Sequence, residues 1–560
     1  MTEEQDKPWQ ARWFDTALVA TLVAAVCTRA TVTEGGFGLS LLHGLFLLLG
    51  YVLLSALLRR MSQTLATGLL VLTAVLLLSE LSVQLLTGLH VNWFLVSLLL
   101  QPDAETQIGF SGLRVIALVA LLALTIGIAS WKARSHATPL SPLLWTALTV
   151  GIFVSAQWVY TVAYFDGAAR ILETRRTLPF FWAPHPYRSN KLLGYIFGPR
   201  GENPFSVSKE TDRTPTSEPT SVNPNLADLS SAPNILIIIA DSWRAKDLVE
   251  TQAIAPSFLA TRDTGYLSLN HSSVSNCTHF SMYSLFTGKL ATGYGHQRRQ
   301  MRPTGLLQTL YSAGYKVTSA ESIAMNWYNL ADILLPVGTL RQISDREDVY
   351  ESDQQVTANT LEVIEQWQTS SAPQAHVAFF QGTHFPYHGD RFGLGLTSLE
   401  RYKLAITALD KELGTLLEAV ENTATNRRTL VLVTSDHGEE FFDEGIVGHA
   451  SRLTAEQVTV PLLVLGKTPN TKMPRSHTEI HDFILAEIGL LDAGSDTRKP
   501  NILANCDYDH PNGFALLTEQ GKFEFTYDDG YLVPTVDTNT AFSKSDVSKA
   551  AKVLLRSITN

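Results

Sequence analysis

The chain of 560 residues changes character near residue 165. Before that point leucine, valine, alanine and isoleucine dominate, and the apolar positions run on without the polar face that a buried core helix carries. About 20 consecutive apolar residues are enough to cross a bilayer as a helix. Five such runs lie near Thr16–Val32, Leu39–Leu58, Leu65–Leu89, Val115–Trp131 and Leu143–Val162. We therefore predict a domain of five transmembrane helices over residues 1–165.

Basic residues in the short connections predict the orientation of these helices. They are Lys7, Arg12, Arg59, Arg60, Lys132 and Arg134, whereas residues 89–112 contain acidic residues and no lysine or arginine. Lysine and arginine accumulate on the cytoplasmic side of membrane proteins. The N-terminus is therefore expected in the cytoplasm. After five crossings, the chain beyond about Tyr164 would lie on the opposite side, which in a bacterium is the periplasm.

Residues 166–232 form the next predicted part of the chain, a basic and aromatic segment that ends in a linker. The linker, residues 201–232, is rich in serine, threonine, proline, asparagine and glutamate. Basic side chains interleaved with aromatic rings beside a membrane suit anionic lipid head groups. The candidate lipid-binding residues are Arg175, Arg176, Arg188 and Lys191. A solvated connector helix is an equally good interpretation of this segment.

Net charge and cysteine content exclude one class of partner and one class of fold. The net charge of −10 argues against a nucleic-acid partner. The three cysteines are too few for a disulfide scaffold. Cys27 lies in an apolar run, and the sequence leaves open whether Cys277 and Cys506 pair.

From about residue 233 to 505, apolar strands alternate with helical stretches. NILIIIAD, HVAFFQGTHFP and TLVLVTSDHG are apolar runs that each end in polar residues. This alternation predicts an α/β domain with a mostly parallel sheet and helices on both faces. Residues 506–560 are expected to form an extension of short strands and a terminal helix.

Polar residues at the strand ends suggest a metal site. Ligands bind outside the carboxyl ends of the strands in such sheets, and Asp241, Asp436 and His437 offer the oxygen and imidazole ligands of one divalent ion such as Zn²⁺, Mn²⁺ or Mg²⁺. A single ion cannot use all the carboxylates that follow. Glu439, Glu440, Asp443 and Glu444 are therefore expected to begin a solvated acidic helix.

The order of these motifs resembles the sulfatase branch of the alkaline phosphatase superfamily. Asp241 is followed by the loop SNCTHFSMYSLFTG, then His384, then Asp436-His437, then His449. In sulfatases the nucleophile lies ten residues before the glycine of a T-G pair, which here gives Thr278. Sulfatases use a cysteine within a Cys-x-Pro-x-Arg signal for conversion to formylglycine. This chain lacks that signal, so aldehyde-dependent sulfatase activity is not expected.

The bacterial phosphoethanolamine and phosphoglycerol transferases resemble the chain more closely, because they use an unmodified threonine behind a five-helix anchor. The motifs ADSWRA and SDHGEEF are similar to theirs. The resemblance implies the following roles: Thr278 as nucleophile; Asp241, Thr278, Asp436 and His437 as metal ligands; His384 and His449 as groups that hold phosphate oxygens or protonate the leaving group. Arg244 and Cys277 would support them from a second layer. Cys277, adjacent in sequence, stays open as an alternative nucleophile.

Three further segments resemble the YejM (PbgA) family of inner-membrane, sulfatase-fold proteins. They are GLHVNWFLVSLLLQPDAETQIGFS, YFDGAARILETRRTLPFFWAPHPYRSNKLLGY and AFSKSDVSKAAKVLLRSITN. The resemblance implies cardiolipin and lipopolysaccharide as membrane partners, together with a membrane or cytoplasmic regulator of lipopolysaccharide synthesis. It favours a metal-dependent phosphatase or phosphotransferase in outer-membrane lipid homeostasis. A dedicated phosphoethanolamine or phosphoglycerol transferase and a non-catalytic lipid sensor are the alternatives.

Overall fold

The protein is described from a computed structural model. It describes residues 14–34, 36–87, 91, 112–133, 141–166, 171, 178–182, 186–198, 231–393, 396–424, 427–444, 446–492, 498–507, 509–528, 531–535 and 542–559. The chain divides into two compact units, Met1–Val207 with Tyr531–Ala551, and Ser208–Gly530 with Lys552–Asn560. Nearly all of the predicted linker lies outside the described residues, as do Arg175 and Arg176.

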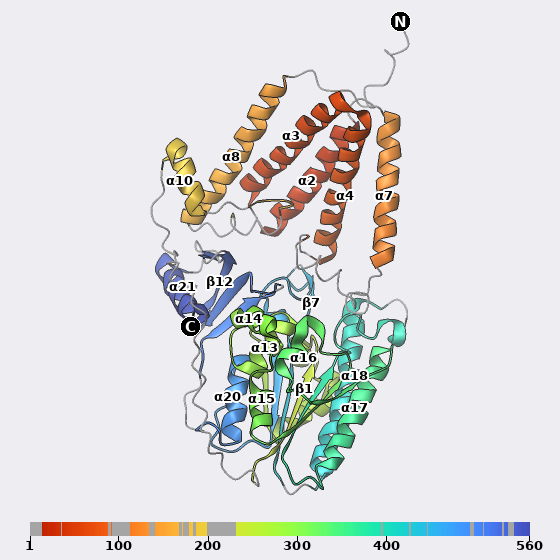
Figure 1. Ribbon diagram of the computed structural model, residues 1–560, viewed down its shortest axis with the longest axis vertical. Helices are drawn as coiled ribbons and strands as arrows, with labels where there is room; N and C mark the ends of the chain where they lie inside the picture. The colour runs from red at the N-terminus through yellow and green to blue at the C-terminus, as the bar shows by residue number, and fades with distance from the viewer. Residues whose placement is uncertain are drawn as a thin grey trace. The chain divides into compact units, whose positions relative to one another are not determined.

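The first unit contains a helix at each of the five predicted apolar runs (Figure 1). The helices are α2 (Phe14–Glu34), α3 (Phe37–Met61), α4 (Gln63–Thr87), α7 (Gly112–Ala133) and α8 (Pro142–Asp166). Among the described residues, three stretches are long and apolar enough to cross a membrane: Phe37–Met61, Gln63–Leu85 and Leu143–Ala163. The unit therefore has the features of a membrane anchor, and the five crossings stay a prediction. A shorter helix, α10 (Pro186–Phe197), and the first half of the C-terminal helix α21 (Lys544–Thr559) belong to the same unit.

The second unit is built on a seven-stranded sheet with the order β2-β9-β6-β1-β5-β3-β4. The strands are β1 (Asn234–Ala240), β2 (Tyr266–Ser272), β3 (Lys316–Glu321), β4 (Leu340–Ile343), β5 (Gln374–Phe380), β6 (Thr429–Ser435) and β9 (Thr459–Leu465). Only β9 runs antiparallel to its neighbours β2 and β6, and the other described pairs are parallel. Every residue of β1 and β5 is buried, as continuous apolar runs in the centre of a parallel sheet should be.

Helices cover both faces of this sheet, as the sequence predicts. Figure 1 shows α13, α15 and α20 on one side of β1, and α17 and α18 on the other. The helices are α11 (Lys246–Glu250), α12 (Pro256–Ala260), α13 (Thr278–Thr287), α14 (Tyr294–Gln300), α15 (Leu306–Ser312), α16 (Leu330–Leu334), α17 (Val349–Gln366), α18 (Ser398–Asn422), α19 (Ala455–Val458) and α20 (His477–Glu487). A capping box of Thr397 and Glu400 begins α18, because each side chain bonds to the other's backbone N–H. Trp243, Phe258 and Tyr402 lie in the core between α18 and the sheet.

The remaining strands are short. β7 (Glu440–Phe441) pairs with β8 (Val447–Gly448). β10 (Asn501–Asn505), β11 (Gly513–Thr518) and β12 (Gly521–Asp528) form antiparallel pairs, and β13 (Tyr531–Pro534) follows.

The register of the central strands determines where the site lies. Ala240, the last residue of β1, pairs with Phe380 of β5 and with Ser435 of β6. All three strands are parallel, so the residues that follow them emerge at the same edge of the sheet. Asp241 and Asp436 are therefore neighbours across the sheet.

Acid is expected to destabilise this unit through its buried histidines. His376 on β5 is buried, and the hydroxyls of Thr318 and Thr360 lie 2.8 and 3.2 Å from its two ring nitrogens. Burial lowers the pKa of His376 to about 3, so the ring stays neutral when folded, whereas an unfolded histidine binds a proton below about pH 6.5. The free energy of unfolding should therefore fall as the pH drops below 6.5, by about 2 kcal/mol at pH 5 for this one ring.

Thermal unfolding at pH 7 and pH 5 checks this prediction. His376→Gln should reduce the pH dependence of the unfolding free energy by the uptake of one proton. A variant with the same pH dependence as the parent protein would contradict it.

Candidate active site

Two aspartates and a histidine meet at the carboxyl edge of the sheet. Asp241 directly follows β1, and Asp436 and His437 directly follow β6. One potential ligand atom from each of the three lies within 4.8 Å of the other two, and all three residues are buried. The structure thus brings together side chains that are almost 200 residues apart in the sequence, as the strand ends predict.

The aspartates are held in an arrangement that leaves one oxygen without a partner. Oδ1 of Asp436 accepts hydrogen bonds from the backbone N–H groups of Ser242 at 3.0 Å and His437 at 2.8 Å. Oδ2 of Asp436 is buried and has no hydrogen-bond partner among the residues that the structure describes. Burial raises the pKa of Asp436 to about 6. Burial and the charge of Asp436 raise the pKa of Asp241 well above its ordinary value. A cation between the carboxylates would satisfy the unpartnered oxygen and offset this cost.

His437 completes a donor set that suits a divalent ion. Its Nδ1 lies 3.0 Å from the Gly438 carbonyl, which assigns the ring proton to Nδ1 and leaves a lone pair on Nε2. Nε2 lies 3.4 Å from Oδ2 of Asp436 and 3.8 Å from Oδ1 of Asp241. Two carboxylates and one imidazole are typical ligands of Zn²⁺ or Mn²⁺. Asp241, Asp436 and His437 would hold the ion, with Thr278 beside them.

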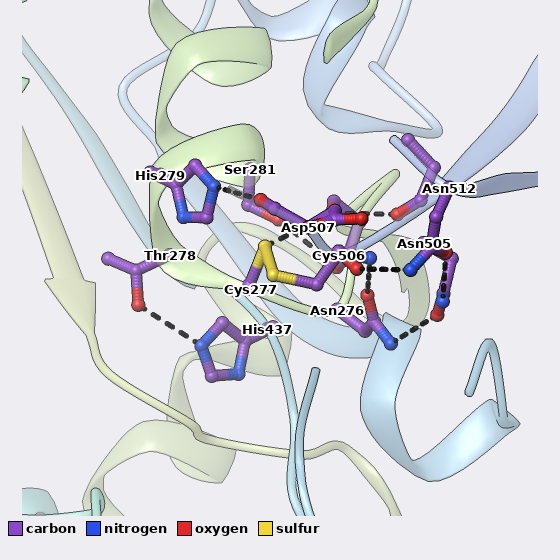
Figure 2. Close-up of a disulfide and its surroundings, with 12 residues drawn as sticks. Asn276, Cys277, Thr278, His279, Ser281, His437, Asn505, Cys506, Asp507 and Asn512 are labelled. Carbon is purple, nitrogen blue, oxygen red and sulfur yellow. Dashed lines mark hydrogen bonds between the residues drawn. A yellow bond between two sulfur atoms is a disulfide. The ribbon is translucent and has the colours of Figure 1, made fainter. Parts of the chain in front are cut away.

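Thr278 is the first residue of α13, and its hydroxyl faces this cluster. Oγ1 lies 3.2 Å from Nε2 of His437 (Figure 2). The N-terminus of a helix carries partial positive charge and unpaired N–H groups, so it favours an anion such as a phosphate ester. The predicted nucleophile is therefore adjacent to the predicted ligands.

Cys277 cannot be the nucleophile, because it forms a disulfide with Cys506 (Figure 2). This bond also answers whether the two cysteines pair. A bonded sulfur cannot attack a substrate or be converted to formylglycine. The disulfide instead joins Cys277, the residue before Thr278, to Cys506 after β10.

His384 and His449 lie beside the ligands, in different environments. The ring centroid of His449 is 4.2 Å from that of His437 and 5.2 Å from that of His384. Burial and the nearby His449 lower the pKa of His384 to about 4. Burial alone would lower the pKa of His449, but the Glu439 carboxylate, with Oε1 3.0 Å from Nδ1, raises it above the ordinary value.

The acidic stretch after His437 differs from its prediction. Glu440–Phe441 and Val447–Gly448 pair as β7 and β8 instead of forming the expected helix. Glu439 and Glu440 are 1% and 0% exposed rather than solvated, whereas Asp443 and Glu444 are exposed as predicted. Burial is tolerated here because Glu439 pairs with His449 and accepts a hydrogen bond from the Tyr387 hydroxyl at 3.2 Å. Glu439 is thus a site residue that sequence reasoning missed.

Arg244 holds this acidic loop in place. Its guanidinium pairs with Asp247 at 2.6 Å and with Asp443 at 2.7 Å, and it donates to the Glu439 carbonyl at 3.1 Å. The side chain is fully engaged and 2% exposed, which is consistent with the supporting role predicted for it. The two cations Arg244 and Lys246, shortly after Asp241, are the sequence signal that the acidic loop would fold back onto this strand end.

Asp353 holds the loop that carries His384 and was not predicted. Its two oxygens accept the backbone N–H groups of Gln381 at 3.0 Å and Gly382 at 2.9 Å. Thr383 then donates to the Asp241 carbonyl at 2.5 Å. Asp353 lies within α17, where nothing in the sequence marks it as different from an ordinary helical aspartate.

Comparisons with known proteins agree with this architecture. Residues 233–490 match the sulfatase family model. The lipooligosaccharide phosphoethanolamine transferase A of Neisseria meningitidis is 15% identical, with 86% of this chain and 97% of that chain covered and a TM-score of 0.54. At this identity the likeness shows a shared fold.

Two further solved structures cover less of the chain. The phosphonate monoester hydrolase of Agrobacterium radiobacter is 17% identical, with 59% of this chain and 96% of that chain covered and a TM-score of 0.45. The lipoteichoic acid synthase LtaP of Listeria monocytogenes is 15% identical, with 66% of this chain and 96% of that chain covered and a TM-score of 0.44. No curated protein matches the chain.

Proposed function

Because residues 233–490 form a sulfatase-fold domain of the alkaline phosphatase superfamily, we propose that this protein is a membrane-anchored, metal-dependent phosphoester hydrolase or phosphotransferase of the YejM type. One observation carries the proposal. The Thr278 hydroxyl lies 3.2 Å from Nε2 of His437, beside the buried cluster of Asp241, Asp436 and His437. The domain would act in the bacterial periplasm, anchored in the inner membrane. The disulfide between Cys277 and Cys506 is consistent with this location, because disulfides form and persist in that oxidising compartment.

Phosphate esters are the favoured substrates over sulfate esters. Sulfatases of this fold rely on an aldehyde made from a cysteine, and here Cys277 is bonded to Cys506. Thr278 keeps an unmodified hydroxyl at the start of α13. When bound, a divalent ion would lower the pKa of that hydroxyl and neutralise charge on the ester oxygens.

The two histidines have different roles: His449 transfers protons, and His384 accepts a hydrogen bond. Thr278 would attack as the alkoxide, after its hydroxyl proton has been released to water. The bond from Oγ1 to phosphorus forms as the bond from phosphorus to the leaving oxygen breaks. His449, kept protonated by Glu439, donates its Nε2 proton to the departing alkoxide. His449 is then neutral and takes the proton of the water or alcohol that displaces the phosphoryl group from Thr278. His384 is neutral, with Nδ1 2.8 Å from the Phe385 carbonyl. Its Nε2 lone pair accepts a hydrogen bond from the incoming water or alcohol.

Exposed side chains in the first unit favour a lipid as substrate or partner. On α10, Arg188 and Lys191 are exposed, as are the apolar side chains of Leu192, Tyr195 and Ile196. A helix with basic and apolar exposed residues next to a membrane helix is suited to the lipid–water interface. Cardiolipin and lipopolysaccharide are the partners we propose, and a regulator of lipopolysaccharide synthesis would be the protein partner.

A dedicated phosphoethanolamine transferase is the second candidate. The fold similarity to the Neisseria phosphoethanolamine transferase over 86% of this chain favours it. Mass spectrometry of lipid A and glycans from a deletion strain separates the two, because a missing phosphoethanolamine or phosphoglycerol substituent would support the dedicated transferase. The third candidate, a lipid sensor without turnover, predicts that residues 1–165 alone rescue a deletion strain.

Metal analysis and ester cleavage by the purified full-length protein test the proposal. We expect one divalent ion per chain, and cleavage of bis(4-nitrophenyl) phosphate that stops when the ion is chelated and returns when it is restored. The matched control, 4-nitrophenyl sulfate, should not be cleaved. A protein that binds the ion and leaves both esters intact would contradict the catalytic proposal and favour the sensor.

A further inference from the structure

The loops that carry Thr278 and His449 meet at one buried amide, the side chain of Asn276. Asn276 lies two residues before Thr278 and is 0% exposed. Figure 2 shows its amide bonded towards Asn505 and Cys506, while Thr278 turns the other way, towards His437. Neither a ligand nor the nucleophile therefore accounts for this side chain.

Asn276 is bonded first to the loop that follows His449. Its Nδ2 donates to the Arg452 carbonyl at 3.0 Å and to Oε1 of Gln457 at 3.1 Å. Its backbone carbonyl accepts the N–H of Ala450, the residue after His449, at 2.9 Å. Gln457 extends the contact, because its Nε2 donates to the Ser451 hydroxyl at 2.8 Å.

The same amide is also bonded to the segment at the end of β10. Nδ2 of Asn276 lies 2.9 Å from Oδ1 of Asn505, and Oδ1 of Asn276 accepts the Cys506 N–H at 2.9 Å. The disulfide between Cys277 and Cys506 joins these two segments covalently. Asn276 thus uses both its donor and its acceptor atoms, as a buried amide must.

The disulfide and the amide hold different parts of the site. The disulfide crosslinks only residues 277 and 506, whereas Asn276 also bonds to residues 450–457. A shift of about 1 Å between reacting groups can cost about 100-fold in rate. The relative placement of Thr278 and His449 is therefore sensitive to this one side chain.

We propose that Asn276 is a positioning residue, which fixes the nucleophile loop to the His449 loop so that Thr278 and His449 act on the same bound ester. The inference rests on the proposed phosphoester chemistry. It adds that the distance between nucleophile and acid is set by a hydrogen-bonded amide that is not itself a ligand of the ion. The ion's own ligands, Asp241, Asp436 and His437, come from other loops and should bind it without Asn276.

The test compares Asn276→Ala and Asn276→Asp with Asn234→Ala in the full-length protein loaded with Zn²⁺. Asn234 is an equally buried asparagine at the opposite end of β1 from Asp241, and its Oδ1 accepts the Gln374 N–H at 3.1 Å. With bis(4-nitrophenyl) phosphate, we expect kcat of both Asn276 variants to fall about 100-fold at nearly unchanged KM and full zinc content. Asn276→Asp keeps the shape of the side chain but sets a carboxylate oxygen against three acceptors. Asn234→Ala should lose stability and keep its kcat.

Hydrogen–deuterium exchange provides a readout that does not need turnover. Losing the amide should speed exchange at residues 450–457 and at Cys506 by roughly 10-fold or more, since an unsatisfied buried bond costs about 1–3 kcal/mol. Unchanged kcat, zinc loss in both Asn276 variants, or an equal fall in kcat for Asn234→Ala would each overturn the inference. If the parent protein cleaves no ester, the proposed function fails, and unchanged exchange at residues 450–457 would separately overturn the positioning role.

Discussion

Replacing Thr278 with alanine is expected to lower kcat for phosphodiester cleavage by at least about 1000-fold while the bound ion is retained. The change removes the oxygen atom that we propose forms the covalent intermediate. The proposed ligands of the ion, Asp241, Asp436 and His437, stay in place. Steady-state kinetics with bis(4-nitrophenyl) phosphate, together with metal analysis of the same sample, measures both parts of this prediction.

Thr278→Ser is the matched control, because it keeps a hydroxyl at the start of α13. We expect it to retain activity within about 10-fold of the parent protein. A phosphoryl adduct should be found by mass spectrometry on the peptide that contains Thr278, in the parent protein and the serine variant but not in the alanine variant. Full activity of Thr278→Ala would show that another group is the nucleophile.

Replacing Asp436 with asparagine should abolish both ion binding and turnover. The asparagine side chain has the same shape but no negative charge, and its Nδ2 nitrogen takes the place of Oδ2, the unpartnered oxygen. The parent protein should gain about 2.7 kcal/mol of stability when the free ion is present at 100 times its dissociation constant. Asp436→Asn should gain little, since it no longer binds the ion tightly.

Without added ion, the order of stabilities is expected to reverse. Asp241 and Asp436 are both buried, and the charge of Asp436 helps to raise the pKa of Asp241. Removing one of the two charges relieves this repulsion. In the presence of a chelator, Asp436→Asn should therefore unfold at a temperature equal to or above that of the parent protein. Thermal scans with and without chelator decide the matter, and a variant stabilised by the ion as much as the parent would refute the assigned ligand set.

Most of the fold was predictable because its signals are local. The apolar runs near the N-terminus and the strands NILIIIA and TLVLVTS follow from composition and length alone. The number of membrane crossings was less so. Among the described residues, three helices have a stretch long and apolar enough to cross a membrane, so the number of five crossings stays a prediction.

The site divides in the same way. Asp241, Asp436 and His437 could be found because parallel strands deliver their last residues to one edge of a sheet. Glu439 could not, since a run of acidic residues has the same composition whether it is solvated or buried against His449 and Tyr387. The pairing of Cys277 with Cys506 depends on a chain path that no local pattern encodes.

The order of synthesis gives the covalent link at Cys277 one more consequence. Thr278 is made early in the second unit, whereas Cys506, the disulfide partner of Cys277, follows 229 residues after Cys277. A nascent chain, or a product truncated before Asn505, carries the hydroxyl on an untethered loop. We therefore expect a chain truncated before Cys506 to be less active, because the loop that carries Thr278 is not joined to the segment after β10.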